Sequence, residues 1–338
     1  MTILDSSHNT SADTFDVSIV IASFNTRDVL RECLESVERE SAGLRVEVLV
    51  VDNHSSDGSP QMIEREFPQV RLFRSEVNLG FASANNVALE VVRGRYPVLL
   101  NSDAFLRAGA LALAVQYMDE NPSVGLAGAR LVGRDDAWQP SARMFPSLLT
   151  DFFVMTGLAG KFPKSRLFGR FDRTWADPMV ACECDWVPGA FSIIRAEALR
   201  KAGVFDPEFF LYSEEVDLCR RIKDAGYKIV YWPDIVVTHI GGESSRQVKS
   251  LEMSKAGAQL VLWRMRSTLL YYRKHHGWGA WLEKMLEIGL YRLVVLRNSF
   301  SKDERRQARA REHRKLITLM EQAWSDTQGG RVSPPRPW

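Results

Sequence analysis

Carboxylates and one imidazole directly follow apolar runs at four places in the chain. Asp52 ends "VEVLVVD", Asp103 follows "YPVLLNS", and His239 ends "DIVVTH". At the fourth place, "FFLYSEEVDLC", Glu214 and Glu215 follow an aromatic stretch. A strand-end carboxylate can accept hydrogen bonds from a base or ribose, and carboxylates and imidazoles bind divalent cations. A glutamate at the rim of a pocket can act as a general base.

Each of these residues also has a structural explanation. Asp52 opens "DNHSSDGS", whose composition is typical of a turn that caps a helix. Glutamates in a first helical turn face the positive end of the macrodipole. Asp217 and Arg221 are spaced for an i,i+4 pair worth a few tenths of a kcal/mol. Taken singly, Asp52, Asp103 and His239 favour these structural roles, so the argument depends on their combination.

Apolar periodicity predicts the elements that must position these groups. Runs of strand length occur at 17–25, 46–53, 70–75, 96–103, 124–132, 189–195 and 227–242, and helical spacing separates most of them. We expect an α/β fold with a mostly parallel central sheet flanked by helices, with ligands at the carboxyl ends of the strands. Residues 140–180 are irregular, as in a lid or an insertion. Helices are expected within 251–300 and 302–324.

Charge is unevenly distributed along the 338 residues. Residues 243–338 hold 19 Lys/Arg against 9 Asp/Glu, a net of +10, whereas residues 1–242 have a net of −8. A basic tail on an acidic body indicates an anionic partner. No stretch is apolar enough to predict a transmembrane helix. The Trp-rich segment 277–300 is typical either of a helix lying in a membrane interface or of one packed on the protein body.

Two further patterns bear on location. The four cysteines include no CxxC pair, which favours reduced thiols in a cytoplasmic protein over a zinc site. The first sixteen residues lack the basic start and apolar core of a signal peptide.

Along the chain, the groups stand in the order strand-end Asp, strand-end Asn-x-Asp, Glu-Glu and strand-end His. This order resembles the inverting glycosyltransferases of family 2, which have the GT-A fold, and within them the rhamnosyltransferase-like branch. The matching stretches are "VSIVIASFN", "VVDNHSSDGS", "NLGFASANNVAL", "LLNSDAFL", "DWVPGAFSIIR", "FFLYSEEVDLCRRIKDAGY" and "VVTHIGGESS". They cover roughly residues 16–246 in register.

The resemblance implies roles for individual residues. The nucleotide-sugar would be bound by Ser23, Asn25, Asp52, Asn53, Asn78, Gly80, Asn85 and Asn101. Asp103 and His239 would bind a divalent cation, Mg²⁺ or Mn²⁺, although Asn101 replaces the first aspartate of the family's Asp-x-Asp signature. Trp186 and Gly189 would face the acceptor. The family usually has Glu-Asp where this chain has Glu-Glu, and the second residue is the base, so Glu215 is the expected base and Glu214 the alternative.

The resemblance also implies the function. We expect an inverting hexosyltransferase that moves a sugar from a nucleotide-diphosphate sugar to a glycan or polyprenyl-linked acceptor, in cell-surface polysaccharide biosynthesis. Deoxythymidine-diphosphate rhamnose is the first donor expected and a uridine-diphosphate sugar the second. The expected location is the inner face of the cytoplasmic membrane, held peripherally by the C-terminal helices on an anionic surface. Nucleic acid is not expected as a partner.

Other functions fit less well. A dinucleotide-dependent oxidoreductase would have GxGxxG after the first strand, where this chain has "ASFNTRD". A processive polymerase of the same family would need membrane-spanning helices and a Gln-x-x-Arg-Trp signature. The alternative that remains is an inactive adaptor of the same fold that binds nucleotide-sugar or nucleic acid.

We divide the chain into four parts. They are a disordered lead-in (1–15), a GT-A glycosyltransferase domain (16–246), a basic helical extension that could associate with membrane (247–325) and a disordered tail (326–338).

Overall fold

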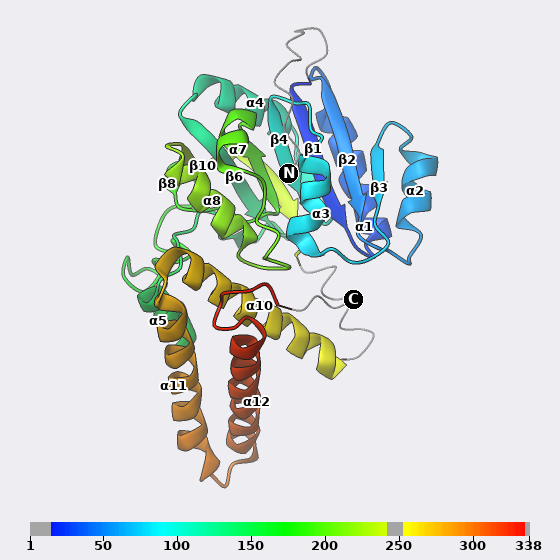
Figure 1. Ribbon diagram of the computed structural model, residues 1–338. Coiled ribbons are helices and arrows are strands. Elements are labelled where there is room, and N and C mark those ends of the chain that lie inside the picture. The colour runs from blue at the N-terminus through cyan, green and yellow to red at the C-terminus, as the bar shows by residue number, and fades with distance from the viewer. Residues whose placement is uncertain (1–14, 242–252, 335–338) are drawn as a thin grey trace.

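The computed structural model describes residues 15–241 and 253–334. A central sheet with helices on its faces forms one part, and three long C-terminal helices form the other (Figure 1). Most of the predicted lead-in, residues 1–14, lies outside the described residues, as does the predicted boundary at 246–247.

The first half of the sheet is parallel, as the continuous apolar runs predicted. Its strands are β1 (Val17–Ser23), β2 (Val46–Asp52), β3 (Arg71–Arg74) and β4 (Tyr96–Leu100), in the spatial order β3-β2-β1-β4. The helices that connect them are α1 (Arg27–Glu40), α2 (Ser59–Glu66) and α3 (Gly80–Leu89). Parallel pairing brings the carboxyl ends of β1 and β2 to the same edge, where Ser23 lies opposite Asp52.

The second half of the sheet is mixed. The strands are β5 (Ala104–Leu106), β6 (Val124–Val132), β7 (Trp138–Gln139), β8 (Cys182–Cys184), β9 (Phe191–Ile194) and β10 (Lys228–His239). β6 and β10 are parallel, but β9 runs antiparallel between β4 and β6, and β5 runs antiparallel to β10. The predicted α/β fold is confirmed, and its sheet contains more antiparallel pairing than the sequence pattern indicated.

The remaining helices refine two predictions. They are α4 (Ala110–Glu120), α5 (Leu148–Met155), α6 (Leu158–Lys161), α7 (Ala196–Ala202), α8 (Glu214–Asp224), α10 (Met253–His276), α11 (Gly279–Ser299) and α12 (Glu304–Asp326). The segment predicted to be irregular therefore contains two short helices, and α5 packs against α11. The helical region predicted within 251–300 is broken at Gly277, whose φ of +53° lies in the left-handed region.

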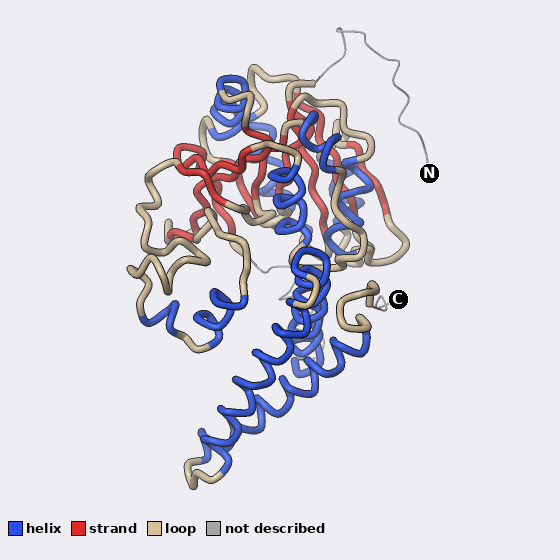
Figure 2. Tube along the Cα trace, turned by 60° about the vertical axis from the view of Figure 1, so that its left-hand side comes forward, coloured by secondary structure: helices blue, strands red, loops and turns tan. Residues whose placement is uncertain are grey.

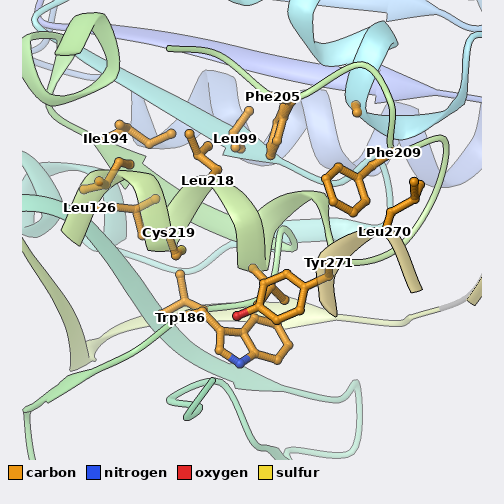
Figure 3. Close-up of a cluster of buried hydrophobic side chains, with 14 of the residues drawn as sticks. Leu99, Leu126, Trp186, Ile194, Phe205, Phe209, Leu218, Cys219, Leu270 and Tyr271 are labelled. Carbon is orange, nitrogen blue, oxygen red and sulfur yellow. The ribbon is translucent and has the colours of Figure 1, made fainter. Parts of the chain in front are cut away.

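The C-terminal helices share a hydrophobic core with the sheet domain. Tyr271 and Leu270 of α10 belong to the same buried cluster as Phe209, Leu218 and Trp186 (Figure 3). Helix α10 therefore packs on the body, and α11 and α12 project from it as a hairpin (Figures 1 and 2).

Part of the predicted tail is packed as well. Arg273 Nε donates to the carbonyl of Gly329 at 3.0 Å, and Ser333 Oγ donates to the carbonyl of Glu208 at 3.1 Å. The prediction of a disordered tail was therefore wrong for residues 327–334, because these contacts hold the chain against α10 and the body. Within the described residues, no helix is long and apolar enough to cross a membrane.

Candidate functional site

Asp52 ends β2 with one carboxylate oxygen engaged and the other unpaired. Oδ2 accepts a hydrogen bond from the Ser55 amide at 3.1 Å, which is the turn that the sequence indicated. Oδ1 is buried and has no hydrogen-bond partner. A buried acceptor without a donor is costly unless a ligand supplies one. Asp52 can thus shape the turn and still accept a hydrogen bond from a ligand.

Asn53 holds the next loop in place. Its Nδ2 donates to Asn78 Oδ1 at 2.9 Å and to the Gly80 carbonyl at 3.3 Å, while its Oδ1 accepts from the Leu79 amide at 2.7 Å. The polar atoms of its side chain are therefore used inside the protein. Asn53 and Asn78 position the 78–80 loop, and Asn53 has no donor left for a ligand.

Gly80 connects this loop to the segment that precedes the glutamates. Its φ is +79°, and a Cβ there would lie 2.3 Å from the carbonyl oxygen of Phe210. The amide of Phe81 donates to the same carbonyl at 2.8 Å. Only glycine permits this approach, so the nucleotide side of the predicted site and the Glu-Glu segment are in direct contact.

The other predicted nucleotide-binding residues lie around the ends of β1 and β4 and in α3. Ser23 Oγ is 3.0 Å from Thr26 Oγ1, which donates to Ser102 Oγ. Asn25 has a φ of +52°, and its Oδ1 accepts from the Ser56 amide. Asn85 is buried and its Nδ2 donates to the Phe81 carbonyl, while the backbone amide of Asn101 donates to the Ala190 carbonyl.

Asp103 and His239 meet at the second cluster of strand ends, where Asp103 Oδ1 lies 3.5 Å from His239 Nε2. Gln139, which the sequence analysis missed, orients the imidazole. Its Nε2 donates to the His239 carbonyl at 2.8 Å, which turns its Oε1 toward His239 Nδ1 at 3.0 Å. Nδ1 therefore carries a hydrogen, and Nε2, which faces the carboxylate, is the nitrogen that could bind a metal.

Asp103 Oδ1 and His239 Nε2, which lie side by side, are a carboxylate oxygen and an imidazole nitrogen of the kind that bind divalent cations. The described residues contain no group of three or more His, Cys, Asp or Glu side chains arranged for a metal. The pair could therefore supply only part of a coordination shell. That fits Mg²⁺ or Mn²⁺, which take the rest of their ligands from water and substrate phosphates.

Glu214 and Glu215 begin α8 and are largely buried. The Oε2 atom of each has no hydrogen-bond partner. Burial raises the pKa of Glu214 well above its ordinary value, and the neighbouring charge of Glu215 raises it further. Burial also raises the pKa of Glu215, but a hydrogen bond from its own backbone and the charge of the Arg143 guanidinium oppose that shift. Glu214 therefore favours the protonated form, and Glu215 is the better candidate for an ionised base.

The backbone before these glutamates is strained. Tyr212 and Ser213 have φ values of +72° and +68°, although neither is glycine. Such residues cost about 1–3 kcal/mol each and occur often at functional sites. The strained pair turns the chain sharply, so that α8 starts with both carboxylates inside the protein.

Trp186 and Gly189, the predicted acceptor residues, lie on the segment before β9. Trp186 is buried, and its Nε1 donates to the Met144 carbonyl at 2.9 Å. Gly189 faces the Phe81 ring, which a Cβ would approach to 3.0 Å. Arg143, in the segment predicted to be irregular, lies with its guanidinium 5.0 Å from the Trp186 ring. Trp186 thus packs against Arg143, the cation whose charge opposes the rise in the pKa of Glu215.

Asp217 has a structural role. It is fully buried and accepts hydrogen bonds from Arg221 and His275, each at 2.8 Å, while Lys274 Nζ also lies at 2.8 Å. Burial alone would raise its pKa, but these partners lower it to about 2. The predicted i,i+4 pair is present. The magnitude expected for a surface pair does not apply to it, because this carboxylate is buried and has two cations and an imidazole as partners.

Comparison with known proteins supports the resemblance. The family model described as "Glycosyl transferase family 2" matches residues 18–202. A Mycobacterium tuberculosis protein named N-acetylglucosaminyl-diphospho-decaprenol L-rhamnosyltransferase is 26% identical over 285 residues, which are 80% of this chain and 89% of the relative. Rhamnosyltransferase WbbL of Escherichia coli is 27% identical over 269 residues, 75% of this chain and 92% of that relative.

Among solved structures, a mannosyltransferase from Pyrobaculum calidifontis, in complex with GDP-Man and Mn²⁺, has a similar fold. Its TM-score is 0.55 at 17% sequence identity, and the match covers 93% of this chain and 88% of that one. At this identity the likeness concerns the fold.

Proposed function

The chain belongs to glycosyl transferase family 2, and on that basis we propose that it transfers a sugar, with inversion, from a nucleotide-diphosphate sugar to a lipid-linked glycan acceptor. Rhamnose is the sugar we expect, because two relatives matched over most of their length are named rhamnosyltransferases. The acceptor follows from the name of the first, which specifies a diphospho-decaprenol substrate. The reaction would serve cell-surface polysaccharide biosynthesis.

The buried glutamate pair is the observation that carries this proposal. Inversion in one displacement needs a base that takes the proton from the acceptor hydroxyl as it attacks the anomeric carbon. Glu215 fits this role because its carboxylate has an unpaired oxygen and the Arg143 charge favours its ionised form. Glu214, protonated beside it, leaves only one negative charge to be stabilised in the buried site.

The donor would lie along the strand ends. Asp52 Oδ1 would accept a hydrogen bond from the base or ribose. Asp103 and His239 would hold a divalent cation, with Gln139 keeping the imidazole in the required tautomer. Such a cation, when bound, neutralises charge on the leaving diphosphate. The contact between the 78–80 loop and Phe210 would hold the donor-binding loop at a fixed position relative to the two glutamates.

A lipid-linked acceptor would place the reaction at a membrane, and we propose the inner face of the cytoplasmic membrane as the location. The net charge of +10 on residues 243–338 supports an anionic surface as the partner.

The test is a donor screen followed by two matched substitutions. Purified protein with Mg²⁺ or Mn²⁺ is mixed with a panel of nucleotide-sugars, and thermal shift and transfer to a polyprenyl-diphosphate acceptor are measured. Glu215→Gln should reduce kcat by about 10²–10⁴-fold while donor binding persists. Glu214→Gln should reduce it less. Because the base must be ionised, activity should fall at low pH, with a midpoint above the pKa of an ordinary glutamate.

Full activity of Glu215→Gln would exclude that residue as the base. Donor binding without transfer to any acceptor would instead favour an adaptor that has kept the fold.

A further inference from the structure

Helix α11 exposes large apolar side chains along its whole length. With the residues that flank it, the exposed set is Trp278, Trp281, Leu282, Met285, Leu293, Leu296 and Phe300. Their exposed fractions run from 44% to 86%. Spacings of three and four residues, with a two-turn interval between Met285 and Leu293, place them on one side of the helix. We call this set the apolar stripe.

The opposite side of the same helix is buried, and it contains two glutamates beside Ala280 and Ile288 of the hydrophobic core. Glu283 and Glu287 are each only 1% exposed. Tyr291 donates to Glu287 Oε2 at 2.9 Å, and Arg264 of α10 lies 3.5 Å from Glu287 Oε1. Ordinary surface helices bury their apolar side and expose their polar side. Helix α11 instead buries two carboxylates and leaves the apolar stripe exposed, which indicates that the stripe meets a second apolar phase.

Basic side chains surround the far end of the α11–α12 hairpin. Residues 292–315 contain nine lysines and arginines against three acidic residues. All nine are exposed: Arg292, Arg297, Lys302, Arg305, Arg306, Arg309, Arg311, Arg314 and Lys315. Within the described chain, none of the nine forms an ion pair with an Asp or Glu side chain. The hairpin projects away from the sheet domain, so this positive end is open to a partner (Figure 2).

We propose that the apolar stripe docks into the surface of an anionic bilayer, with α11 in the membrane plane and the nine basic residues against lipid headgroups. A second copy of the chain is a poorer occupant, because it would bring the same positive charge to the interface. An anionic bilayer supplies both the apolar phase and the opposite charge. The proposal deepens the proposed function: α10 joins α11 to α8, so docking would fix the height of Glu214 and Glu215 above the lipid-linked acceptor.

The experiment is vesicle co-sedimentation of the full chain without donor or acceptor. Vesicles of phosphatidylcholine with phosphatidylglycerol should bind the protein, neutral phosphatidylcholine vesicles much less, and salt should weaken the binding. Leu293→Ser/Leu296→Ser should reduce the bound fraction by about tenfold. The matched control is Met179→Ser/Val180→Ser, whose side chains are equally exposed in the segment before β8; it should bind like the wild type.

A second measurement reports insertion directly. Vesicles with brominated acyl chains should quench tryptophan emission, and Trp278→Phe/Trp281→Phe should abolish the quenched component while binding persists. Absence of binding to anionic vesicles, or equal binding by the Leu293→Ser/Leu296→Ser variant, would overturn the proposal. So would a dimer in solution that this variant dissociates, since it would assign the stripe to a second copy. Donor binding, measured separately on the same protein preparations without vesicles, tests the proposed function independently.

Discussion

At the scale of single residues, the candidate site contains buried oxygen atoms without a hydrogen-bond partner and one imidazole that a neighbouring side chain orients. Asp52 Oδ1 and the Oε2 atoms of Glu214 and Glu215 are buried without partners, while Gln139 determines which nitrogen of His239 faces Asp103. Neighbours that the sequence does not mark thus decide what the marked residues can bind.

Gln139→Ala should weaken metal binding. The substitution removes the acceptor that keeps the hydrogen on His239 Nδ1, and loss of such an outer partner typically costs about 10–100-fold in affinity. Titration of Mn²⁺ by electron paramagnetic resonance, with donor present, measures the effect. Gln116→Ala, at an exposed glutamine of α4, should leave the affinity unchanged. If both variants bind Mn²⁺ like the wild type, His239 is not a ligand held by Gln139.

At the scale of elements, the 78–80 loop and the turn before α8 are locked together. Gly80→Ala combines a left-handed backbone with a Cβ only 2.3 Å from the Phe210 carbonyl. We expect it to lower the free energy of unfolding by roughly 2–5 kcal/mol and to reduce turnover by displacing the glutamates. Urea denaturation and transfer assays measure the two effects.

Gly43→Ala is the matched control for that substitution. Gly43 has nearly the same φ, +80°, but nothing lies within 4 Å of the added Cβ. It should cost only about 1–2 kcal/mol and leave turnover intact. Equal costs for the two variants would mean that the contact with Phe210 is not what requires glycine at position 80.

Helix α11 holds a buried acid whose protonation should affect stability. Burial raises the pKa of Glu283 to about 9, and the charges of Asp151 and Glu287 contribute. The folded state retains a proton that the unfolded chain releases near its ordinary pKa of 4.5, so stability falls as pH rises from about 4.5 toward 9.

Glu283→Gln removes this titration. At pH 8 it should raise the free energy of unfolding by on the order of 1–3 kcal/mol, whereas at pH 5 the difference should be small. Denaturation at the two pH values measures it, with Glu321→Gln on the exposed side of α12 as the control. A stability gain that is the same at both pH values would contradict the assignment.

At the scale of the whole molecule, α10 ties the C-terminal helices to the catalytic domain. Its Lys274 and His275 contact Asp217 of α8, and its aromatic residues share the core beneath the sheet. The helical extension is thus part of the structure that positions the glutamates.

Asp217→Asn should weaken this connection. The pKa of Asp217 is lowered from 3.8 to about 2, so its ionisation stabilises the fold above pH 4, and this contribution is lost as pH falls toward 2. The shift corresponds to about 2 kcal/mol at pH 7. Asp224→Asn, at an exposed aspartate of the same helix, is the control. Unchanged stability of Asp217→Asn between pH 2 and pH 7 relative to wild type, with stability followed by urea denaturation, would refute this role.

The sequence by itself determined the strand ends and what they carry. Buried parallel strands need continuous apolar runs, so the residues that follow each run, Asp52 and Asp103 among them, were predictable as neighbours at one edge of the sheet. The order of these groups along the chain was sufficient to indicate the family. Local pattern is enough where burial and periodicity alone decide the outcome.

Only the tertiary structure decided the rest. No local pattern encodes long-range pairings. Three of them matter here: the antiparallel pairing of β9, the hydrogen bonds of Gln139 with His239, and the contact of Gly80 with Phe210. Helix α11 is the clearest case. In the sequence, Glu283 and Glu287 interrupt an apolar segment, but in the structure both glutamates are buried and the residues of the apolar stripe are exposed. Which side of a helix is buried depends on the partners that pack against it: here the neighbouring helices α10 and α12, and α5 from a distant part of the chain.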